Sequence, residues 1–323
     1  MSDLQPINRT PAEDIIFALA CESGKPSGES SLLFAAKSSG IYRSPDGGKH
    51  WELAFHLENM QEPLPALSIC LSPDFEHDHN VFVGVPGGVL RSFDRGVTWK
   101  VENLASPPPV TGALVISPNF IEDGILLAGT NEDGIFRSLD RGLHWSTCNF
   151  NLLDLNVLSL AISPDFAHDE MLFAGTVSGL FRSKNGGRAW REVDFPFGYD
   201  PVLSLAFDPG FTDSRMMLAG TETQGLQVSR DAGATWERIG EDVLVQPINA
   251  ILFGHSTWGA GMVFVLNGDQ VFCSDDGLQG WQEWEPAARL NEGISAIALA
   301  GWETGSIPQL LAGLADGRVV VLN

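Results

Sequence analysis

The sequence predicts an all-β fold, a seven-bladed β-propeller whose blades are four-stranded antiparallel sheets. Three observations support this prediction. A motif of eight residues recurs along the chain, its copies are 45 to 48 residues apart, and short apolar runs bounded by Gly, Pro, Asp or Asn lie between the copies. Glycine occupies 35 and proline 19 of the 323 positions, which implies many turns and argues against a helical bundle.

The recurring motif is Ser-x-Asp-x-Gly-x-x-Trp. Five copies begin at Ser44, Ser92, Ser138, Ser183 and Ser229, and a sixth has its glycine displaced. A tight turn needs a residue that tolerates positive φ, which glycine supplies, and the Asp carboxylate accepts bonds from backbone N–H groups of the same turn. The tryptophan then opens the fourth strand with a large apolar surface that locks the turn onto the blade. The motif residues to which we assign this structural role are Asp46, Trp51, Asp94, Trp99, Asp140, Trp145, Asn185, Trp190, Asp231, Trp236 and Trp281.

Each period contains four strand candidates, which are clearest in the fourth copy. They begin at Val157, Met171, Gly179 and Trp190. The first is almost continuously apolar, as expected for a strand with neighbouring sheets on both faces, and small residues such as Ser159 stand where those sheets should approach closely. Four short strands in roughly 40 to 50 residues, with no helical period between them, are typical of a propeller blade.

The blades are expected to form one domain over residues 1–323. The last repeat stops one strand short, and residues 3–10 precede the first complete blade. We therefore expect this N-terminal strand to pair with the C-terminal strands and close the ring. The predicted blade boundaries are 11–56, 57–104, 105–150, 151–196, 197–242, 243–287 and 288–323.

These octapeptides resemble the Asp-box, or bacterial neuraminidase repeat (BNR). The repeat is found in sialidases, sortilin-type receptors, xyloglucan hydrolases and the photosystem II stability and assembly factor family, and the last of these is the most similar in style. The resemblance covers essentially the whole chain and implies a propeller with the Asp-box turns at its periphery. It implies little about activity, because activity differs from one of these families to the next.

Composition excludes several classes of partner. The formal net charge is −22, which repels nucleic-acid phosphates and anionic membrane surfaces. No apolar run approaches the roughly 20 residues needed to cross a bilayer, and the start of the chain lacks the pattern of an export signal, so we expect a cytoplasmic protein that binds no nucleic acid and does not insert into membranes. No motif indicates a cofactor. The cysteines lack metal-site spacing and are interpreted as free thiols: Cys21, Cys70, Cys148 and Cys273.

Two groups of residues suggest a binding site but have a simpler interpretation. The segment around His77 and His79 has the residue types of a metal site, but related segments with Pro, Phe and Asp recur in other blades, so we interpret it as a repeated turn and expect no metal. An arginine also precedes the motif serine in four blades. Because these four residues should be spread around the ring, we expect them to stack or pair locally: Arg43, Arg91, Arg137 and Arg182.

A sialidase-like active site finds little support in the sequence. Such enzymes use a tyrosine nucleophile, and the chain has only Tyr42 and Tyr199. Tyr42 aligns with phenylalanines of other blades, which indicates a core position. Few arginines remain near Tyr199 to bind a substrate carboxylate. No catalytic residue is therefore assigned, although a glycosidase that uses two carboxylates stays open.

The connections from each fourth strand to the next blade are unusually apolar and contain many acids. In a propeller they gather on one face around the channel mouth, where an apolar surface rimmed by one sign of charge favours protein docking. The alternative is that they only pack the loops onto the blade ends. The residues predicted to bind a partner are Met60, Phe150, Asp154, Asp194, Phe195, Phe197, Tyr199 and Asp200.

The sequence thus predicts a non-enzymatic scaffold or assembly factor. Its expected partner is a protein with a basic, partly apolar segment, which the acidic and apolar face would bind. A carbohydrate-active enzyme or a lectin that uses the same face is the alternative, and a self-assembling structural protein is a third possibility.

Overall fold

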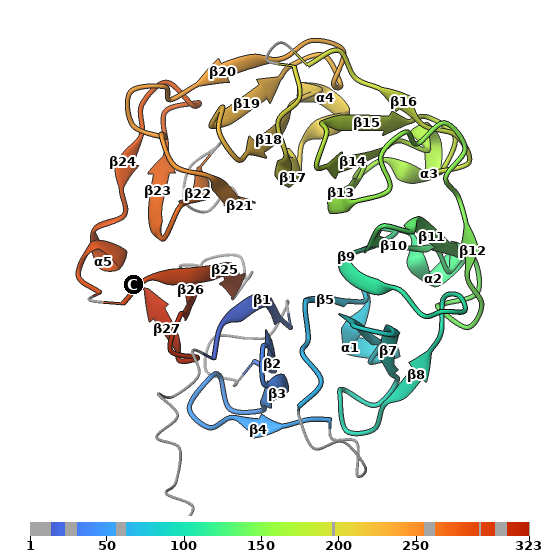
Figure 1. Cartoon of the computed structure of the whole chain (residues 1–323). Coiled ribbons are helices and arrows are strands. Elements are labelled where there is room, and N and C mark those ends of the chain that lie inside the picture. The colour runs from blue at the N-terminus through green and yellow to red at the C-terminus, as the bar shows by residue number, and fades with distance from the viewer. Residues whose placement is uncertain are drawn as a thin grey trace, which may run out of the picture.

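The predicted propeller is confirmed by the computed structural model, which describes residues 14–22, 31–55, 63–195, 198–254, 262–290, 292–300 and 309–322. Seven antiparallel sheets stand around a central axis (Figure 1). In every sheet the strands follow one another in chain order, from the innermost next to the axis to the outermost at the rim. Six sheets have four strands, and the last has three within the described residues.

The strands are short, and the outermost strand of each blade is the shortest. In the first three blades they are β1 (Ile16–Cys21), β2 (Leu33–Lys37), β3 (Gly40–Ser44), β4 (Glu52–Leu53), β5 (Ser68–Leu71), β6 (Val81–Val85), β7 (Gly88–Ser92), β8 (Lys100–Glu102), β9 (Val110–Ile116), β10 (Leu126–Asn131), β11 (Gly134–Ser138) and β12 (Ser146–Thr147). In the fourth and fifth they are β13 (Val157–Ile162), β14 (Leu172–Thr176), β15 (Leu180–Ser183), β16 (Arg191–Glu192), β17 (Val202–Phe207), β18 (Met217–Thr221), β19 (Leu226–Ser229) and β20 (Glu237–Ile239). In the last two they are β21 (Ile248–Phe253), β22 (Val263–Asn267), β23 (Gln270–Ser274), β24 (Gln282–Glu283), β25 (Ile294–Ala300), β26 (Gln309–Leu314) and β27 (Val319–Leu322).

The ring closes where the first blade meets the last. Strand β1 lies beside β25 in Figure 1. The Lys37 ammonium donates to the carbonyl oxygen of Gly317 at 2.6 Å and lies 3.7 Å from the Asp14 carboxylate. The bond to Gly317 joins segments at opposite ends of the chain. The closing strand predicted for residues 3–10 lies outside the described residues.

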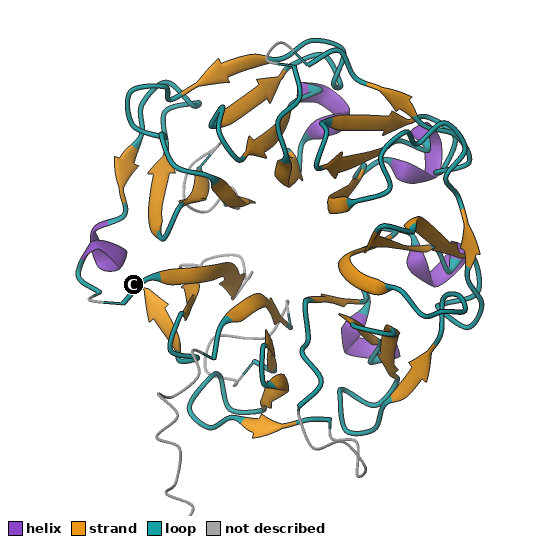
Figure 2. Ribbon diagram, viewed as in Figure 1, coloured by secondary structure: helices purple, strands orange, loops and turns teal. Residues whose placement is uncertain are grey.

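Of the five helices in the described part of the chain, four are single turns that follow the innermost strands of blades two to five (Figure 2). Each begins with a buried phenylalanine and ends at a residue with positive φ. In the second blade, Ser72 Oγ donates to the Asp78 carboxylate at 2.6 Å, and the other oxygen of that carboxylate accepts the Asn80 N–H. This is the repeated turn predicted from the sequence. The helices are α1 (Phe75–Asp78), α2 (Phe120–Asp123), α3 (Phe166–Asp169), α4 (Phe211–Ser214) and α5 (Glu285–Ala288).

The hydrophobic core lies between blades, since each apolar cluster contains side chains of two neighbouring sheets. The innermost strands also meet through hydrogen bonds. Ser159 Oγ donates to the Val202 carbonyl oxygen of the next blade at 2.9 Å, and Ser204 Oγ does the same to Ile248 at 2.7 Å. The interleaved small residues therefore lie where neighbouring sheets approach closely, as the sequence predicts.

The Asp-box turns complete their hydrogen bonds locally. In the third blade, Asp140 Oδ1 accepts bonds from the Ser138 hydroxyl and from the His144 N–H, both at 2.9 Å, and Ser138 Oγ accepts the Gly142 N–H. In the sixth turn, Leu278 takes the place of the motif glycine with φ 73°, and its N–H still donates to Ser274 Oγ. The displaced glycine therefore leaves the turn geometry intact.

The Asp-box tryptophans pack against the preceding blade, and some of them also bond within their own turn. Trp145 belongs to the apolar cluster of the second and third blades, and Trp190 to that of the third and fourth. The ring N–H of Trp145 donates to the carbonyl of Gly142 in its own turn, whereas that of Trp190 donates to the Cys148 carbonyl of the preceding blade at 2.7 Å. The motif tryptophan therefore joins neighbouring blades, a role that the sequence did not predict.

The Asp-box carboxylates should make stability depend on pH in acid. Desolvation raises the pKa of Asp140, but hydrogen bonds from the backbone and ring of His144 and from Ser138 outweigh it and lower that pKa to about 2. The ordinary value in an unfolded chain is about 3.9. The stabilisation by this carboxylate is therefore complete above that value and is lost as the pH falls through about 2.

We expect Asp140→Asn to lower the urea midpoint at pH 7 and to differ less from the parent protein as the pH falls from about 4 to 2. Urea unfolding followed by tryptophan fluorescence at several pH values measures this difference. Asp213→Asn, at an exposed carboxylate outside the Asp-box turns, is the control and should show little effect at any pH. A difference between the Asp140→Asn variant and the parent that is constant with pH would contradict the assignment.

Candidate functional site

The two faces of the ring carry different loops. Helices α1 to α4 and the Asp-box turns share one face, as the bond from the Arg141 N–H to the Gly124 carbonyl oxygen shows. The turns between second and third strands share the other face with the connections between blades. There the Ser178 N–H donates to Asp154 Oδ2 at 2.8 Å. We call this second face the mouth face, and the predicted binding residues belong to its connections.

Two of the predicted acids hold these connections in place. Asp154 accepts the N–H groups of Asn156 and Ser178, and desolvation of its carboxyl is outweighed by these bonds, which lower its pKa. Asp200 is only 3% exposed and accepts the N–H groups of Thr223 and Gln224. Reversing the charge of either residue would leave backbone N–H donors without a partner and would disturb the connection itself. A partner-binding role of these two residues stays a prediction.

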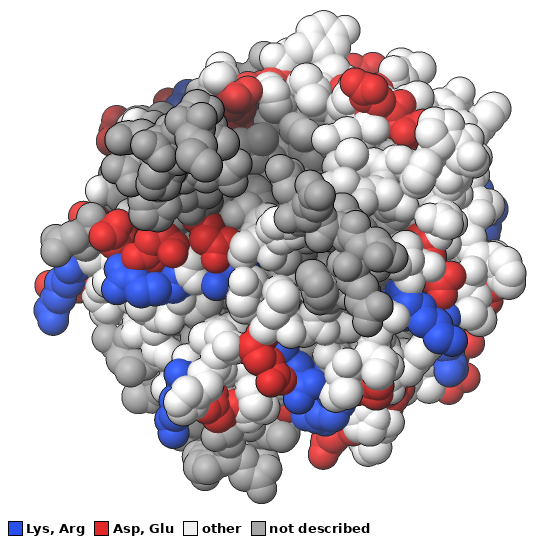
Figure 3. All heavy atoms as spheres, turned by 60° about the horizontal axis from the view of Figure 1, so that its bottom comes forward, with Lys and Arg blue, Asp and Glu red and all other residues white. Residues whose placement is uncertain are grey.

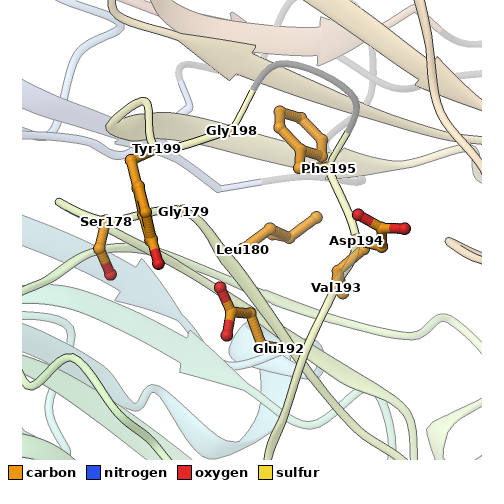
Figure 4. A pocket seen from close by; sticks show the side chains of 9 residues that line it. All are labelled: Ser178, Gly179, Leu180, Glu192, Val193, Asp194, Phe195, Gly198 and Tyr199. Carbon is orange, nitrogen blue, oxygen red and sulfur yellow. The ribbon is translucent and has the colours of Figure 1, made fainter.

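Three other predicted residues line one pocket on the mouth face of the fourth blade, which we call the blade-4 pocket. It has a volume of about 450 Å³ and lies between the turn that precedes β15 and the connection from β16 to β17 (Figure 4). Tyr199 and Ser178 lie on one side, Phe195 and Asp194 on the other, and Leu180 between them. The complete lining is Ser178, Gly179, Leu180, Glu192, Val193, Asp194, Phe195, Gly198 and Tyr199.

The blade-4 pocket combines negative charge with apolar surface. Glu192 and Asp194 are both exposed, and neither has an ion-pair partner among the described residues. Phe195 is buried and packs edge-on against Trp236 of the next blade, with ring centroids 5.4 Å apart. Tyr199 is 83% exposed, so its ring is free to contact a ligand. The pocket is therefore suited to a cation attached to an apolar chain.

Exposed apolar residues continue from the pocket onto the neighbouring connection. Leu155 and Val177 are both exposed, and Leu153 is more so. The Val177 N–H donates to the Asn156 carbonyl oxygen, which places the connection from the third blade against the turn that contributes Ser178 to the pocket. The apolar surface therefore extends beyond the pocket, as a docking face requires.

The remaining predicted binding residues lie elsewhere. Met60 and Phe197 lie outside the described residues. Phe150 is 68% exposed but lines a different pocket at the outer edge of the third blade, so the structure does not bring it together with Tyr199. Glu192 was not among the predicted residues. It stands two positions before Asp194 at the end of a strand, and side chains with this spacing lie on the same face of the strand.

Charge is distributed in separate groups. Figure 3 shows Asp and Glu side chains in several places on the visible face, some of them beside Lys or Arg. Some of the carboxylates that make the protein acidic accept hydrogen bonds within the Asp-box turns and the repeated helical turns, as Asp140 and Asp78 do. The net charge of −22 is therefore only partly a property of the mouth face.

The histidine segment behaves as a repeated turn. His77 Nδ1 lies 2.6 Å from Asp74 Oδ1, a bond that raises the pKa of His77, and the pair His168 and Asp165 repeats it two blades later. His79 occupies the helix end with φ 59°. Among the described residues, no three His, Cys, Asp or Glu side chains lie together so as to hold a metal ion.

The cysteine thiols add a further observation. The four cysteines form no disulfide, and desolvation raises the pKa of both Cys70 and Cys148 to about 12. Both of these residues are therefore neutral thiols at pH 7.

The helices that the structure describes are single turns, and none has the length or apolar character that crossing a bilayer requires.

Comparison with known proteins gives a clear answer on fold only. Neither a protein-family model nor a curated protein matches the sequence. Among solved structures, YCF48 bound to D1 peptide superposes with a TM-score of 0.69 at 15% identity, over 96% of this chain and 93% of that one. YCF48 from Cyanidioschyzon merolae superposes with a TM-score of 0.64 at 14% identity, over 98% and 97%.

Several of the similar structures are much longer than this chain. The GH74 xyloglucanase from Xanthomonas campestris superposes with a TM-score of 0.69 at 15% identity, over 96% of this chain but 52% of its own length. The chain spans 38% to 52% of the first four structures that match it. With its six Asp-box turns and seven sheets, the chain has the Asp-box seven-bladed propeller fold that YCF48 and the GH74 propellers share.

Proposed function

We propose that the protein is a non-enzymatic scaffold that binds a polypeptide segment at the blade-4 pocket. The observation that carries the proposal is that one pocket is lined by the exposed Tyr199 ring and by Glu192 and Asp194, two carboxylates without an ion-pair partner among the described residues. A Lys or Arg side chain would gain an ion pair and a cation–π contact there. The YCF48 structure, which has the same fold and holds a peptide, supports a peptide as the ligand.

The apolar surface next to the pocket defines the rest of the expected segment. Leu155 and Val177 would contact apolar side chains that flank the basic residue. Exposed charges contribute to association rate and specificity, whereas the apolar contacts resist dissociation. The expected partner is therefore a segment in which basic and apolar residues alternate.

The test uses a fluorescent acetylated pentapeptide, Lys-Leu-Arg-Phe-Lys amide, titrated by fluorescence anisotropy. The double variant Glu192→Gln and Asp194→Asn is expected to weaken binding roughly tenfold or more, because two charge-assisted contacts are lost. Tyr199→Ala should weaken it by a smaller factor. Both changes lie at exposed positions and should leave the thermal midpoint unchanged.

A matched control tests whether charge alone is responsible. Glu241 and Asp242 are exposed acids on the next connection, and their substitution by Gln and Asn removes the same charge. Binding should survive in this control. If both double variants lose peptide affinity equally, the effect comes from net charge alone and not from the blade-4 pocket. Unchanged peptide binding in the Glu192 and Asp194 variant would overturn the proposal.

A carbohydrate ligand is the second candidate, and the likeness to the xyloglucanase fold is the observation that favours it. Titration with xyloglucan oligosaccharides, together with a hydrolysis assay on chromogenic glycosides, separates the two functions. Saturable sugar binding that is lost in the Tyr199→Ala variant would favour the carbohydrate function over the peptide function.

A further inference from the structure

Arg137, on β11, differs from the arginines at the same position in other blades. Arg91 is 2% exposed, lies 2.9 Å from the Glu102 carboxylate and donates to the Arg141 carbonyl oxygen of the next blade. Arg43 pairs with Glu52, and Arg182 donates to carbonyl oxygens of the fifth blade. Arg43 and Arg91 therefore pair within their own blades, as predicted, and Arg182 bonds to the next blade instead.

The guanidinium of Arg137 has no such partner among the described residues, and its Nε, like those of Arg43 and Arg91, is buried without a hydrogen bond. Strand register explains the difference from Arg91. Arg91 stands opposite Lys100, and its partner Glu102 is two residues further on. Arg137 stands opposite Ser146, so the residue at the corresponding place is Cys148. The carboxylate of the second blade is therefore replaced by a thiol in the third.

Cys148 cannot neutralise Arg137. Burial raises the pKa of the Cys148 thiol to about 12, so it carries no charge at pH 7. Desolvation and the neighbouring charge of Arg188 both lower the pKa of Arg137, although an arginine remains charged at pH 7. The half-buried positive charge of Arg137 therefore has no carboxylate in direct contact with it among the described residues, although the protein has a net charge of −22.

Arg137 and Cys148 line a pocket of about 470 Å³ at the outer edge of the third blade, which we call the Arg137 pocket. Arg188, from the next Asp-box turn, also lines it. A Cβ built on Gly186 would lie 3.6 Å from Arg137 Nη2 and 3.7 Å from Arg188 Nη1, so the two guanidinium groups approach the same point. The lining is Arg137, Leu139, Ser146, Thr147, Cys148, Asn149, Phe150 and Arg188.

We propose that the Arg137 pocket binds a carboxylate that carries an apolar group. Arg137 would receive from the ligand the carboxylate that Glu102 supplies to Arg91 in the second blade. Arg188 uses Nη2 to bind Glu170 at 2.7 Å, while its Nη1 lies at the point that Arg137 Nη2 also approaches. The exposed side chains of Leu139 and Phe150 supply the apolar walls. Such a ligand is either a small organic acid or the C-terminus of a polypeptide that ends in an apolar residue.

The probe is N-acetyl-phenylalanine, titrated by calorimetry and observed by saturation-transfer NMR. Its amide, which lacks the charge, and inorganic phosphate, which lacks the apolar group, are the reference compounds. The acid is expected to bind roughly tenfold or more tightly than either. An acetylated pentapeptide with a free C-terminal phenylalanine distinguishes the sources: tighter binding than the small acid assigns the pocket to a chain terminus, and equal binding assigns it to a small acid.

Two variants test the role of Arg137 by different routes. Arg137→Gln removes the charge, and Cys148→Glu restores the internal carboxylate of the second blade, so each is expected to weaken binding of the acid roughly tenfold or more. Arg289→Gln removes an exposed arginine from the sixth blade and should bind as the parent does. Circular dichroism shows whether the variants are folded.

Unchanged binding in folded Arg137→Gln or Cys148→Glu protein would overturn the proposal. So would equal binding of the acid and its amide, or of the acid and phosphate. The double variant of Glu192 and Asp194 should leave binding of the acid unchanged, because those residues line the blade-4 pocket and not this one. The two proposals can therefore fail separately.

Discussion

Gly175→Ala is expected to destabilise the protein by about 3 kcal/mol or more, the upper part of the range for overpacking a core. Gly175 lies on β14, where a Cβ would overlap both Ser159 Oγ and the Val202 carbonyl oxygen and would lie 2.9 Å from Val202 Cβ. The hydrogen bond between Ser159 and Val202 joins the fourth blade to the fifth. The added methyl group would therefore push two blades apart, because the Val202 carbonyl oxygen belongs to the backbone and cannot rotate away as a side chain can.

Gly112→Ala is the matched control for this prediction. Gly112 also lies in a strand, β9, but a Cβ there would meet only Asn131 Oδ1, at 3.8 Å. Its substitution should change stability little. Urea unfolding of both variants measures the contrast, and equal midpoints would show that the glycine is not required for close packing of the blades.

Trp190→Ala should cost about 3–5 kcal/mol, as expected for truncation of a large buried side chain. Trp190 is 2% exposed and packs between the third and fourth blades. Its removal would leave a cavity there and would leave the Cys148 carbonyl oxygen without the bond that the indole N–H donates. We expect thermal unfolding at a clearly lower temperature, measured by differential scanning calorimetry.

The same substitution at Trp145 should cost less. Trp145 is only half-buried, and its indole N–H donates to Gly142 within its own turn, so no contact between blades is lost with that bond. A larger loss of stability for Trp145→Ala than for Trp190→Ala would contradict the assignment of Trp190 to the contact between blades.

The fold could be predicted from the sequence because the repeat is encoded locally. The residues of an Asp-box that bond to one another lie within four positions, as Asp140 and His144 do, so spacing alone identifies the turn. Contacts between blades are less visible. The sequence placed Trp190 on its own blade, whereas the structure shows it in the contact with the preceding one.

The candidate site could be predicted only in part. Asp194, Phe195 and Tyr199 follow one another closely along the chain, so their common location was predictable. Ser178 comes from a different turn and was missed, because only the folded blade brings that turn to the connection. The guanidinium of Arg137, which lacks a partner among the described residues, was missed for a related reason: only strand register shows that Cys148 stands where the second blade has Glu102.

The bond from Lys37 to Gly317 has a consequence for the order of folding. It joins residues 280 positions apart, whereas the hydrogen bonds within an Asp-box turn join residues at most four apart. Contacts between distant residues form slowly, because the intervening chain must first lose its freedom. The turns can therefore form while the chain is still being synthesised, and the ring can close only after the last blade has left the ribosome.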